Sequence, residues 1–300
     1  MDKHLLEDCT LCPRNCHADR TRGQTGSCGA SGELMVARAA LHMWEEPCIS
    51  GEKGSGTVFF SGCALGCVYC QNQTIAKGLT GRIITLERLS DIFMELQEKG
   101  ANNINLVTPS HYVPQILEAV RIAKRKGLHL PIVYNSSGYE KAETIKLLQG
   151  YVDIYLPDLK YMSEEISKKY SNAENYFQYA SEAISEMVRQ TGRPVFDHDG
   201  IMTRGVIVRH LTLPGYLKDS KDILEYLQDT FGDKIYISIM NQYTPLPHVE
   251  PYPEINRKIT AEEYDELVDY ALYLGVENGF IQEGETASES FIPEFSEEGV

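Results

Sequence analysis

The side chains best suited to chemistry in this sequence are eight cysteines, all within the first 70 residues. Three of them, Cys63, Cys67 and Cys70, form a CxxxCxxC motif in FFSGCALGCVYCQN, directly after an apolar run. At this spacing, one short loop can wrap three thiolates around an inorganic cluster and leave one iron of a cubane without a protein ligand. An open coordination position is where catalytic metal sites act. The alternative is a structural zinc site whose fourth ligand lies elsewhere in the chain.

This motif, with the aromatic Tyr69 before its third cysteine, resembles that of the radical S-adenosylmethionine enzymes, specifically the pyruvate formate-lyase activating enzyme branch. The similarity extends from about Cys9 to Gln282. In that family the three thiolates hold a [4Fe-4S] cluster, and the amino and carboxylate groups of S-adenosylmethionine chelate the fourth iron. The reduced cluster cleaves the cofactor to methionine and a 5′-deoxyadenosyl radical, which abstracts a hydrogen atom. The resemblance implies that the protein binds and orients these cofactors and excludes water, with Tyr69 among the cofactor-binding residues.

Three further stretches resemble the activating-enzyme pattern, each at the carboxyl end of a predicted strand, where α/β folds place their sites. VDIYLPDLKY implies that Asp158 and Lys160 lie beside the ribose and methionine parts of the cofactor. VRHLTLPGY makes Arg209 the partner of the methionine carboxylate, which suits the paired donors of a guanidinium. In VYNSSGY, Asn135 and Ser137 are placed to contact ribose hydroxyls. Taken alone, a strand-end Asp or Arg is as often part of a turn or a surface ion pair.

Two positions depart from the family pattern. The family ends its second strand with a Gly-Gly-Glu stretch that receives the methionine amino group, whereas this sequence reads LVTPSHY. We expect Thr108, Ser110 and His111 to take over those contacts, although none of them is a carboxylate. Asn135 stands where the activases carry an Asp, which argues against a bound cation there. These departures match the uncharacterised sister group of activase homologues better than the activases themselves, and they leave the substrate open.

A second group of cysteines lies near the amino terminus, in CTLCPRNC followed by GSC, at Cys9, Cys12, Cys16 and Cys28. Four closely spaced thiolates satisfy a closed tetrahedral zinc site, and they can equally hold a second iron–sulfur cluster. We favour zinc or another structural metal, because a fully ligated site offers no open position. An electron-relay cluster is the alternative. Free thiols this crowded would oxidise or capture metal.

The elements that position these groups follow from the hydrophobic pattern. From Ser55 onward, short β-branched or aromatic runs alternate with longer amphipathic stretches, which is typical of βα units on a parallel sheet. The sequence therefore predicts an α/β fold, a partial (β/α)6 TIM-like barrel with a Cys-rich N-terminal extension. Thr85 and Thr260 are predicted to cap two of the helices. The six predicted strands are residues 56–60, 104–108, 132–135, 152–156, 206–211 and 235–240.

Three segments are predicted along the chain. Residues 1–50 form a Cys-rich metal-binding segment with little periodicity, which needs a metal or the neighbouring domain to become ordered. Residues 51–282 form the radical S-adenosylmethionine core. Residues 283–300 form an acidic tail that we expect to be mobile. Three of its apolar side chains could nevertheless dock on the body, namely Phe291, Ile292 and Phe295.

Composition limits the partners. The net charge of −15 and the pI near 5.0 oppose the phosphate attraction that supplies most non-specific affinity for nucleic acid. No run of eighteen apolar residues exists, and acids occupy the place where a signal peptide needs apolar residues. The acidic charge argues against a nucleic-acid substrate. The absence of apolar runs argues against membrane spanning and secretion. Thiols two and three residues apart in a large chain fit metal ligation in a reducing cytoplasm better than disulfides.

Two classes of function remain in competition at this stage. The first is a radical S-adenosylmethionine oxidoreductase, activating-enzyme-like and suited to anaerobic conditions, acting on a protein or peptide, with a small-molecule substrate harder to exclude. Such an enzyme implies an electron donor such as flavodoxin or ferredoxin. The second is a non-catalytic iron–sulfur or zinc-binding protein, or an electron-transfer protein, in which both cysteine groups only hold clusters or zinc.

Overall fold

The computed structural model describes residues 4–282 and 295–300, and one sheet forms its centre. Its strands follow the order β10-β9-β8-β6-β5-β4-β2-β1-β3, with β7 paired to β8. All neighbours from β2 to β10 are parallel, whereas β1 and β3 pair antiparallel. The strands are β1 (Leu34–His42), β2 (Ser55–Phe60), β3 (Arg82–Ile84), β4 (Ile104–Val107), β5 (Ile132–Ser136), β6 (Ile154–Pro157), β7 (Val195–Phe196), β8 (Met202–Leu211), β9 (Tyr236–Met240) and β10 (Gly279–Ile281).

The predicted strands are confirmed, because each of the six predicted runs overlaps one parallel strand, β2, β4, β5, β6, β8 or β9. Consecutive parallel strands lie next to each other in the sheet, as successive βα units require. The α/β class and the partial TIM-like barrel are therefore confirmed. A further parallel strand, β10, lies beside β9 and was not predicted. It has only three residues, too few to show a periodic pattern.

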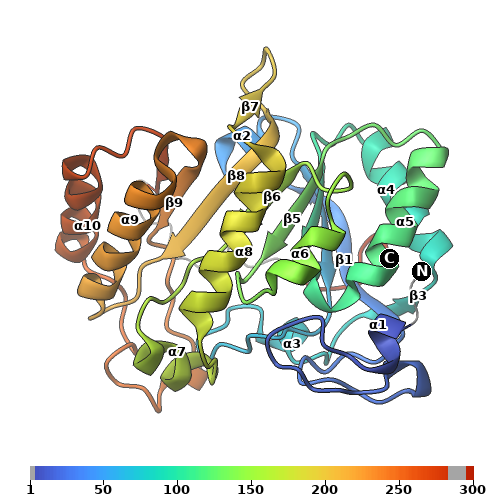
Figure 1. Cartoon of the computed structure of the whole chain (residues 1–300), viewed down its shortest axis with the longest axis horizontal. Helices are drawn as coiled ribbons and strands as arrows, with labels where there is room; N and C mark the ends of the chain where they lie inside the picture. The colour runs from blue at the N-terminus through green and yellow to red at the C-terminus, as the bar shows by residue number, and fades with distance from the viewer. Residues whose placement is uncertain (1–3, 283–294) are drawn as a thin grey trace.

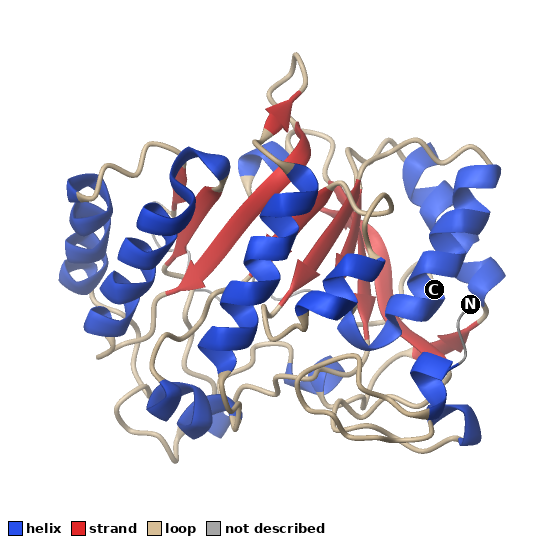
Figure 2. Cartoon of the chain, viewed as in Figure 1, coloured by secondary structure: helices blue, strands red, loops and turns tan. Residues whose placement is uncertain are grey.

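Helices between the parallel strands pack along the outer face of the sheet (Figures 1 and 2). The predicted caps are confirmed: Thr85 Oγ1 accepts a hydrogen bond from Arg88 N at 3.1 Å, and Thr260 forms a capping box with Glu263. The main core lies between these helices and the sheet, where Phe93 and Ile104 are fully buried. The α-helices are α1 (His4–Glu7), α2 (Pro47–Ser50), α3 (Gln73–Ala76), α4 (Leu86–Glu98), α5 (Val113–Arg125), α6 (Ala142–Leu147), α7 (Glu164–Ser171), α8 (Tyr176–Thr191), α9 (Leu217–Phe231) and α10 (Ala261–Tyr273). The 3-10 helices are η1 (Arg20–Arg22), η2 (Ser110–Tyr112), η3 (Gly232–Lys234) and η4 (Pro247–Val249).

Strand β1 lies within residues 1–50, where the sequence predicts little regular structure. It pairs antiparallel with β2, from Val36 opposite Phe60 to His42 opposite Ser55. The sequence LMVARAALH is rich in alanine, which is depleted in strands, so the propensity signal is weak. Backbone pairing with the body therefore orders this part of the segment.

The last described residues also lie against β1. Ala39 N donates to Glu298 O at 2.8 Å, and Glu297 N donates to Ala37 O at 3.1 Å. The Phe295 ring meets Phe59 edge-on, with centroids 5.4 Å apart. Residues 295–300, assigned to a mobile tail from the sequence, thus contact the sheet. The rest of that tail, with Phe291 and Ile292, lies outside the described residues.

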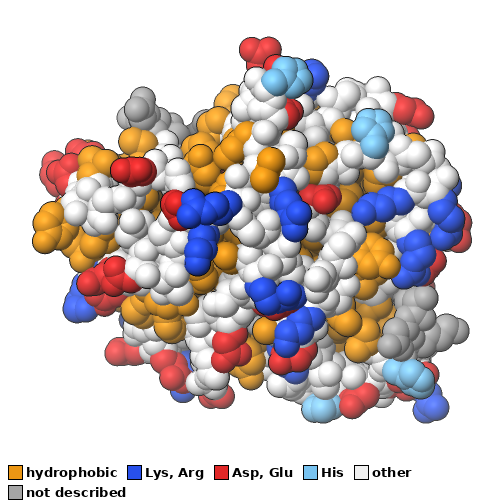
Figure 3. All heavy atoms as spheres, turned by 45° about the horizontal axis from the view of Figure 1, so that its top comes forward, with side chains coloured by type: hydrophobic (Ala, Val, Ile, Leu, Met, Phe, Trp, Pro, Cys, Tyr) orange, Lys and Arg blue, Asp and Glu red, His pale blue; other side chains and the backbone are white. Residues whose placement is uncertain are grey.

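None of the helices in residues 4–282 is long and apolar enough to cross a membrane. On the face shown in Figure 3, Lys and Arg side chains are interspersed with Asp and Glu. Basic groups on that face thus have acidic neighbours.

We predict that Gly138→Ala distorts the loop after β5. Gly138 has a φ of +74°, and a Cβ placed there would lie 2.0 Å from the carbonyl oxygen of Asp158. We expect urea unfolding to show a loss of roughly 2 to 4 kcal/mol, from strain plus the clash. Gly150→Ala is the control, because Gly150 has a φ of +79° with nothing within 4 Å of an added Cβ. It should lose only about 1 to 2 kcal/mol, and equal losses in the two variants would refute the clash.

Candidate active site

A cavity of about 460 Å³ lies inside the curve of the sheet. This volume falls within the range of ligand pockets, roughly 300–1,000 Å³. Its wall combines the loop after β2, the carboxyl ends of the parallel strands, and the loop between β1 and α2. The predicted site residues in this wall are Cys63, Cys67, Cys70, Tyr69, Thr108, Asn135, Ser137, Asp158, Lys160 and Arg209.

The loop that carries Cys63, Cys67 and Cys70 turns its three thiols into this cavity. Burial, together with the neighbouring sulfurs of Cys67 and Cys63, raises the pKa of Cys70 to about 12. Burial and Cys67 likewise raise the pKa of Cys63. Three thiolates that repel one another in a buried space would be stabilised by a positively charged iron core, so the donor set fits a [4Fe-4S] cluster. In the described part of the chain, no three His, Cys, Asp or Glu side chains are already grouped to hold a metal ion.

Tyr69 anchors the middle of this loop. Its hydroxyl lies 2.6 Å from that of Tyr161, and its ring packs edge-on against Tyr243 at 5.8 Å between centroids. Val68 N, next to it, donates to Tyr170 O at 2.8 Å. The tyrosine therefore lines the cavity with its ring, while its hydroxyl bonds to the protein.

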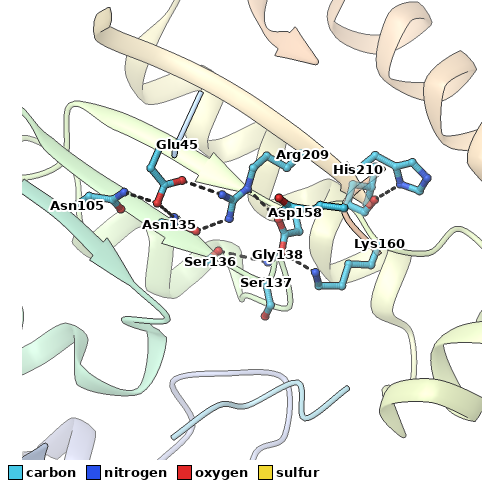
Figure 4. Close-up of polar contacts among 12 residues, drawn as sticks. Glu45, Asn105, Asn135, Ser136, Ser137, Gly138, Asp158, Lys160, Arg209 and His210 are labelled. Carbon is cyan, nitrogen blue, oxygen red and sulfur yellow. Dashed lines mark hydrogen bonds and ion pairs between the residues drawn. The ribbon is translucent and has the colours of Figure 1, made fainter. Parts of the chain in front are cut away.

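A chain of largely buried charges crosses the cavity (Figure 4). Lys160 Nζ lies 2.6 Å from Asp158 Oδ2, and Arg209 Nε donates to Asp158 Oδ1 at 3.1 Å. Arg209 also donates from Nη1 to Glu45 Oε2 at 3.1 Å and from Nη2 to Asn135 Oδ1 at 2.5 Å. Burial alone would raise the pKa of Asp158, but the two cations hold it below its ordinary value. Asp158 is therefore ionised at neutral pH.

Arg209 retains donors for a ligand. A guanidinium has five N–H donors, and the contacts to Asp158, Glu45 and Asn135 use three of them. The remaining two are enough for a carboxylate. Pairing of Arg209 with the methionine carboxylate stays a prediction that this geometry allows.

Thr108 lines the cavity in an unusual backbone conformation. Its φ is +56°, in the left-handed region where β-branched residues are rare. Its backbone N donates to Asn135 O at 2.9 Å, which ties the end of β4 to β5. Strain of this kind is concentrated at functional sites and costs of order 1–3 kcal/mol.

Ser110 and His111 do not line the cavity, contrary to our expectation. After Thr108 the chain turns into η2, and both side chains are buried among protein groups. Ser110 donates to Glu140, and His111 Nε2 lies 2.7 Å from Ser61 O. Burial lowers the pKa of His111 to about 3, so this ring is neutral. Its position indicates support for the start of the cysteine loop rather than contact with the cofactor.

Sequence reasoning missed the acids of the β1–α2 loop. The side chain of Glu45 is 8% exposed, and its Oε1 accepts from Asn105 Nδ2 at 3.0 Å in addition to the bond from Arg209. Glu46 is also 8% exposed and lines the cavity. A sequence signal did exist, since two consecutive acids lie between Trp44 and Pro47 with no basic residue beside them. For residues 1–50, which include this loop, the sequence predicts only metal binding.

The four amino-terminal cysteines are neighbours in the fold, although no three of their thiols are grouped closely enough to hold a metal ion. The Sγ atoms of Cys16 and Cys28 lie 3.1 and 3.5 Å from the position of a Cβ at Gly26. Burial raises the pKa of Cys12 to about 12, with Cys28 and Cys9 contributing repulsion. The guanidinium of the fully buried Arg20 lies 3.9 Å from Cys9 Sγ.

This segment also braces the loop of the other cysteines. Cys63 N donates to Cys28 O at 3.1 Å, so the two cysteine groups are joined through the backbone. Arg14 donates from Nε to Ala64 O at 2.8 Å and from Nη2 to Leu65 O at 3.0 Å. The amino-terminal segment therefore helps to fix the shape of the loop.

Residues 57–227, more than half of the chain, match the Radical SAM superfamily. The chain therefore belongs to this superfamily, whose members are enzymes, and membership implies cleavage of S-adenosylmethionine with a [4Fe-4S] cluster. An uncharacterized protein of Methanocaldococcus jannaschii is 27% identical over 277 residues, which cover 90% of this chain and 75% of the relative.

Two solved structures share the fold. The FeFe-hydrogenase maturase HydG from Carboxydothermus hydrogenoformans has a TM-score of 0.52 at 14% identity, over 77% of this chain and 54% of that one. The chain thus corresponds to about half the length of the maturase. Methylornithine synthase (PylB) has a TM-score of 0.50 at 15% identity, over 77% of this chain and 74% of that one.

His210 provides a test of the packing beside the charged network. Its Nδ1 lies 2.8 Å from Leu159 O, which can only accept, so Nδ1 carries the proton and Nε2 accepts from Ser220 Oγ at 2.8 Å. Burial lowers the pKa of His210 to about 4, below the ordinary 6.5. The unfolded chain therefore takes up a proton first, and stability should be lost as the pH falls from about 6.5 to 4, by about 3 kcal/mol.

Urea unfolding of His210→Gln across this pH range should show a shallower loss than the wild type. His198→Gln is the control, because His198 is exposed at the tip of the β7–β8 hairpin. An unchanged pH dependence in His210→Gln would contradict the assignment of a neutral buried ring.

Proposed function

We propose that this enzyme is an activating-enzyme-like oxidoreductase that abstracts a hydrogen atom from a protein or peptide substrate. The observation that supports it best is that the three thiols of the CxxxCxxC loop and the buried Lys160–Asp158–Arg209 network face one cavity. When bound, the cluster supplies the electron that cleaves S-adenosylmethionine to methionine and the hydrogen-abstracting 5′-deoxyadenosyl radical. Cys63, Cys67 and Cys70 would hold this cluster.

The residues of the chain would bind and orient the cofactor. Burial alone would lower the pKa of Lys160, but Asp158 and the Cys67 sulfur raise it. Lys160 thus remains a cation beside the thiols. Asp158 and Asn135 line the same cavity as the thiols and would meet ribose hydroxyls, and Arg209 has donors left for a carboxylate.

An aromatic wall would exclude water from the site. The tyrosine rings packed around the loop at Tyr69, Tyr161 and Tyr243 are at most 4% exposed. A dry site protects a reactive intermediate from side reactions. The electron would come from a reductase such as flavodoxin or ferredoxin.

Replacing Cys67 by Ala should abolish both the visible absorbance of the cluster and the formation of 5′-deoxyadenosine, because the remaining two thiolates do not hold the cubane. The measurement is an anaerobic assay with reconstituted protein and a chemical reductant. Cys48→Ala is the matched control, since Cys48 is buried in a separate apolar cluster with Ile49 and Val133. It should retain both signals. Full cleavage by the Cys67→Ala protein would refute the assignment.

We also propose that Cys9, Cys12, Cys16 and Cys28 hold a separate structural metal, with zinc as the first choice. Their proximity to one another beside the buried Arg20 supports it. Metal binding contributes roughly 10 kcal/mol or more to the folding of isolated zinc modules.

The variant with Cys63, Cys67 and Cys70 all replaced by Ala tests this second site. Metal and sulfide analysis should find one tightly bound zinc ion per chain and no sulfide. Iron with sulfide would indicate a second cluster instead. A metal-free, folded variant would show that these thiols do not bind a metal.

A further inference from the structure

The acidic loop at Glu45 and Glu46 lies away from the cysteines along the cavity. These residues directly precede α2, whereas the cysteine loop directly precedes α3, and the two helices lie near opposite ends of the strands (Figure 1). Both loops line the same cavity. A cofactor held by the cysteines and the network around Asp158 would leave the Glu46 side for the molecule that gives up the hydrogen atom.

Acidic side chains outnumber basic side chains in the wall of this cavity. Its wall carries three carboxylates, at Glu45, Glu46 and Asp158, but only two cations, at Lys160 and Arg209. Asp158 pairs with both cations, and Glu45 pairs with Arg209. The acid left without an ion pair among the described residues is Glu46. A buried carboxyl without an ion pair is costly to ionise, so a cation from outside would favour its charged form.

The side chain of Glu46 has an oxygen that can accept a hydrogen bond from a ligand. It is 92% buried, and its Oε2 has no hydrogen-bond partner within the described residues. Burial raises the pKa of this carboxyl, Arg209 opposes the rise, and Glu45 adds to it. A donor that brings its own positive charge would satisfy the free oxygen and cancel the repulsion from Glu45.

We propose that Glu46 binds the ammonium group of the substrate, and that this substrate carries a primary amine on an aliphatic stem, as a lysine side chain does. The inference rests on the proposed function. The apolar side chains of Leu211, Met240 and Phe280 line the same cavity and suit a methylene stem. Trp44 also lines it, with a ring 68% exposed that can attract a cation on its way in.

Trp44 supplies a direct readout, because it is the only tryptophan of the chain and lies two residues from Glu46. Reconstituted protein with S-adenosylmethionine is titrated anaerobically with N-acetyl-lysine amide while tryptophan fluorescence is recorded. N-acetyl-norleucine amide, which has the same stem without the amine, is the neutral probe. We expect a saturable change with the lysine probe and at least tenfold weaker binding of the norleucine probe.

Glu46→Gln keeps the shape of the side chain and removes its charge, so it should bind the lysine probe at least tenfold more weakly. Glu87→Gln, at an exposed position on α4, should bind like the wild type. Comparing the two variants separates the effect of the charge at the cavity on binding from the effect of the overall charge of the protein. Equal binding of the two probes by the wild type, no saturable change with either, or unchanged binding by Glu46→Gln would overturn the proposal.

A separate measurement distinguishes this inference from the proposed function. Formation of 5′-deoxyadenosine without substrate depends on the cysteines and the cofactor contacts, and it should persist in Glu46→Gln. Loss of that activity in Glu46→Gln would place the carboxylate at the cofactor and overturn the inference. If the wild-type protein binds the amine but cleaves no S-adenosylmethionine, the amine site is supported and the proposed function is refuted.

Discussion

Arg209 is the charge on which the interior of the barrel depends. Its guanidinium joins side chains from three other parts of the chain: Glu45 before α2, Asn135 on β5 and Asp158 after β6. A buried cation is tolerated only because these acceptors surround it. Breaking such a buried pair typically costs about 3 to 5 kcal/mol, since a charge is then left uncompensated. The same constraint keeps Asp158 ionised and holds Lys160 in place beside the thiols.

The two segments that carry the cysteine groups are joined by hydrogen bonds, although the two groups differ in expected role. Backbone bonding of Cys63 to Cys28 and the donors of Arg14 fix the loop that would carry the cluster. The buried Arg20 extends this contact, because it lies beside Cys9 and donates to His111 O at 2.5 Å. Order in the amino-terminal segment would therefore influence the geometry of the loop that carries Cys63, Cys67 and Cys70.

Sequence patterns predicted the parallel strands and the helix caps because both depend on local chemistry. The apolar runs at β2 and β5 fill the core, and Thr85 satisfies backbone groups only three residues away. Strand β1 was not predicted, because its alanines have little preference for strands. Its pairing partner is β2, which follows later in the chain. Likewise, nothing local to Ser110 and His111 indicates that η2 turns them away from the cavity.

The sequence by itself determined the superfamily and the three cysteines of its motif, since residue type and spacing within one loop already specify that chemistry. It also placed Asp158, Lys160 and Arg209 at strand ends, where parallel strands bring side chains together. Which charges meet depends on the folded arrangement of the chain. Glu45 and Glu46 reach the cavity because β1 folds back along β2, and no periodicity in residues 1–50 encodes that contact. Charge balance in a buried space is set by residues far apart in the chain, so it becomes visible only when the chain is folded.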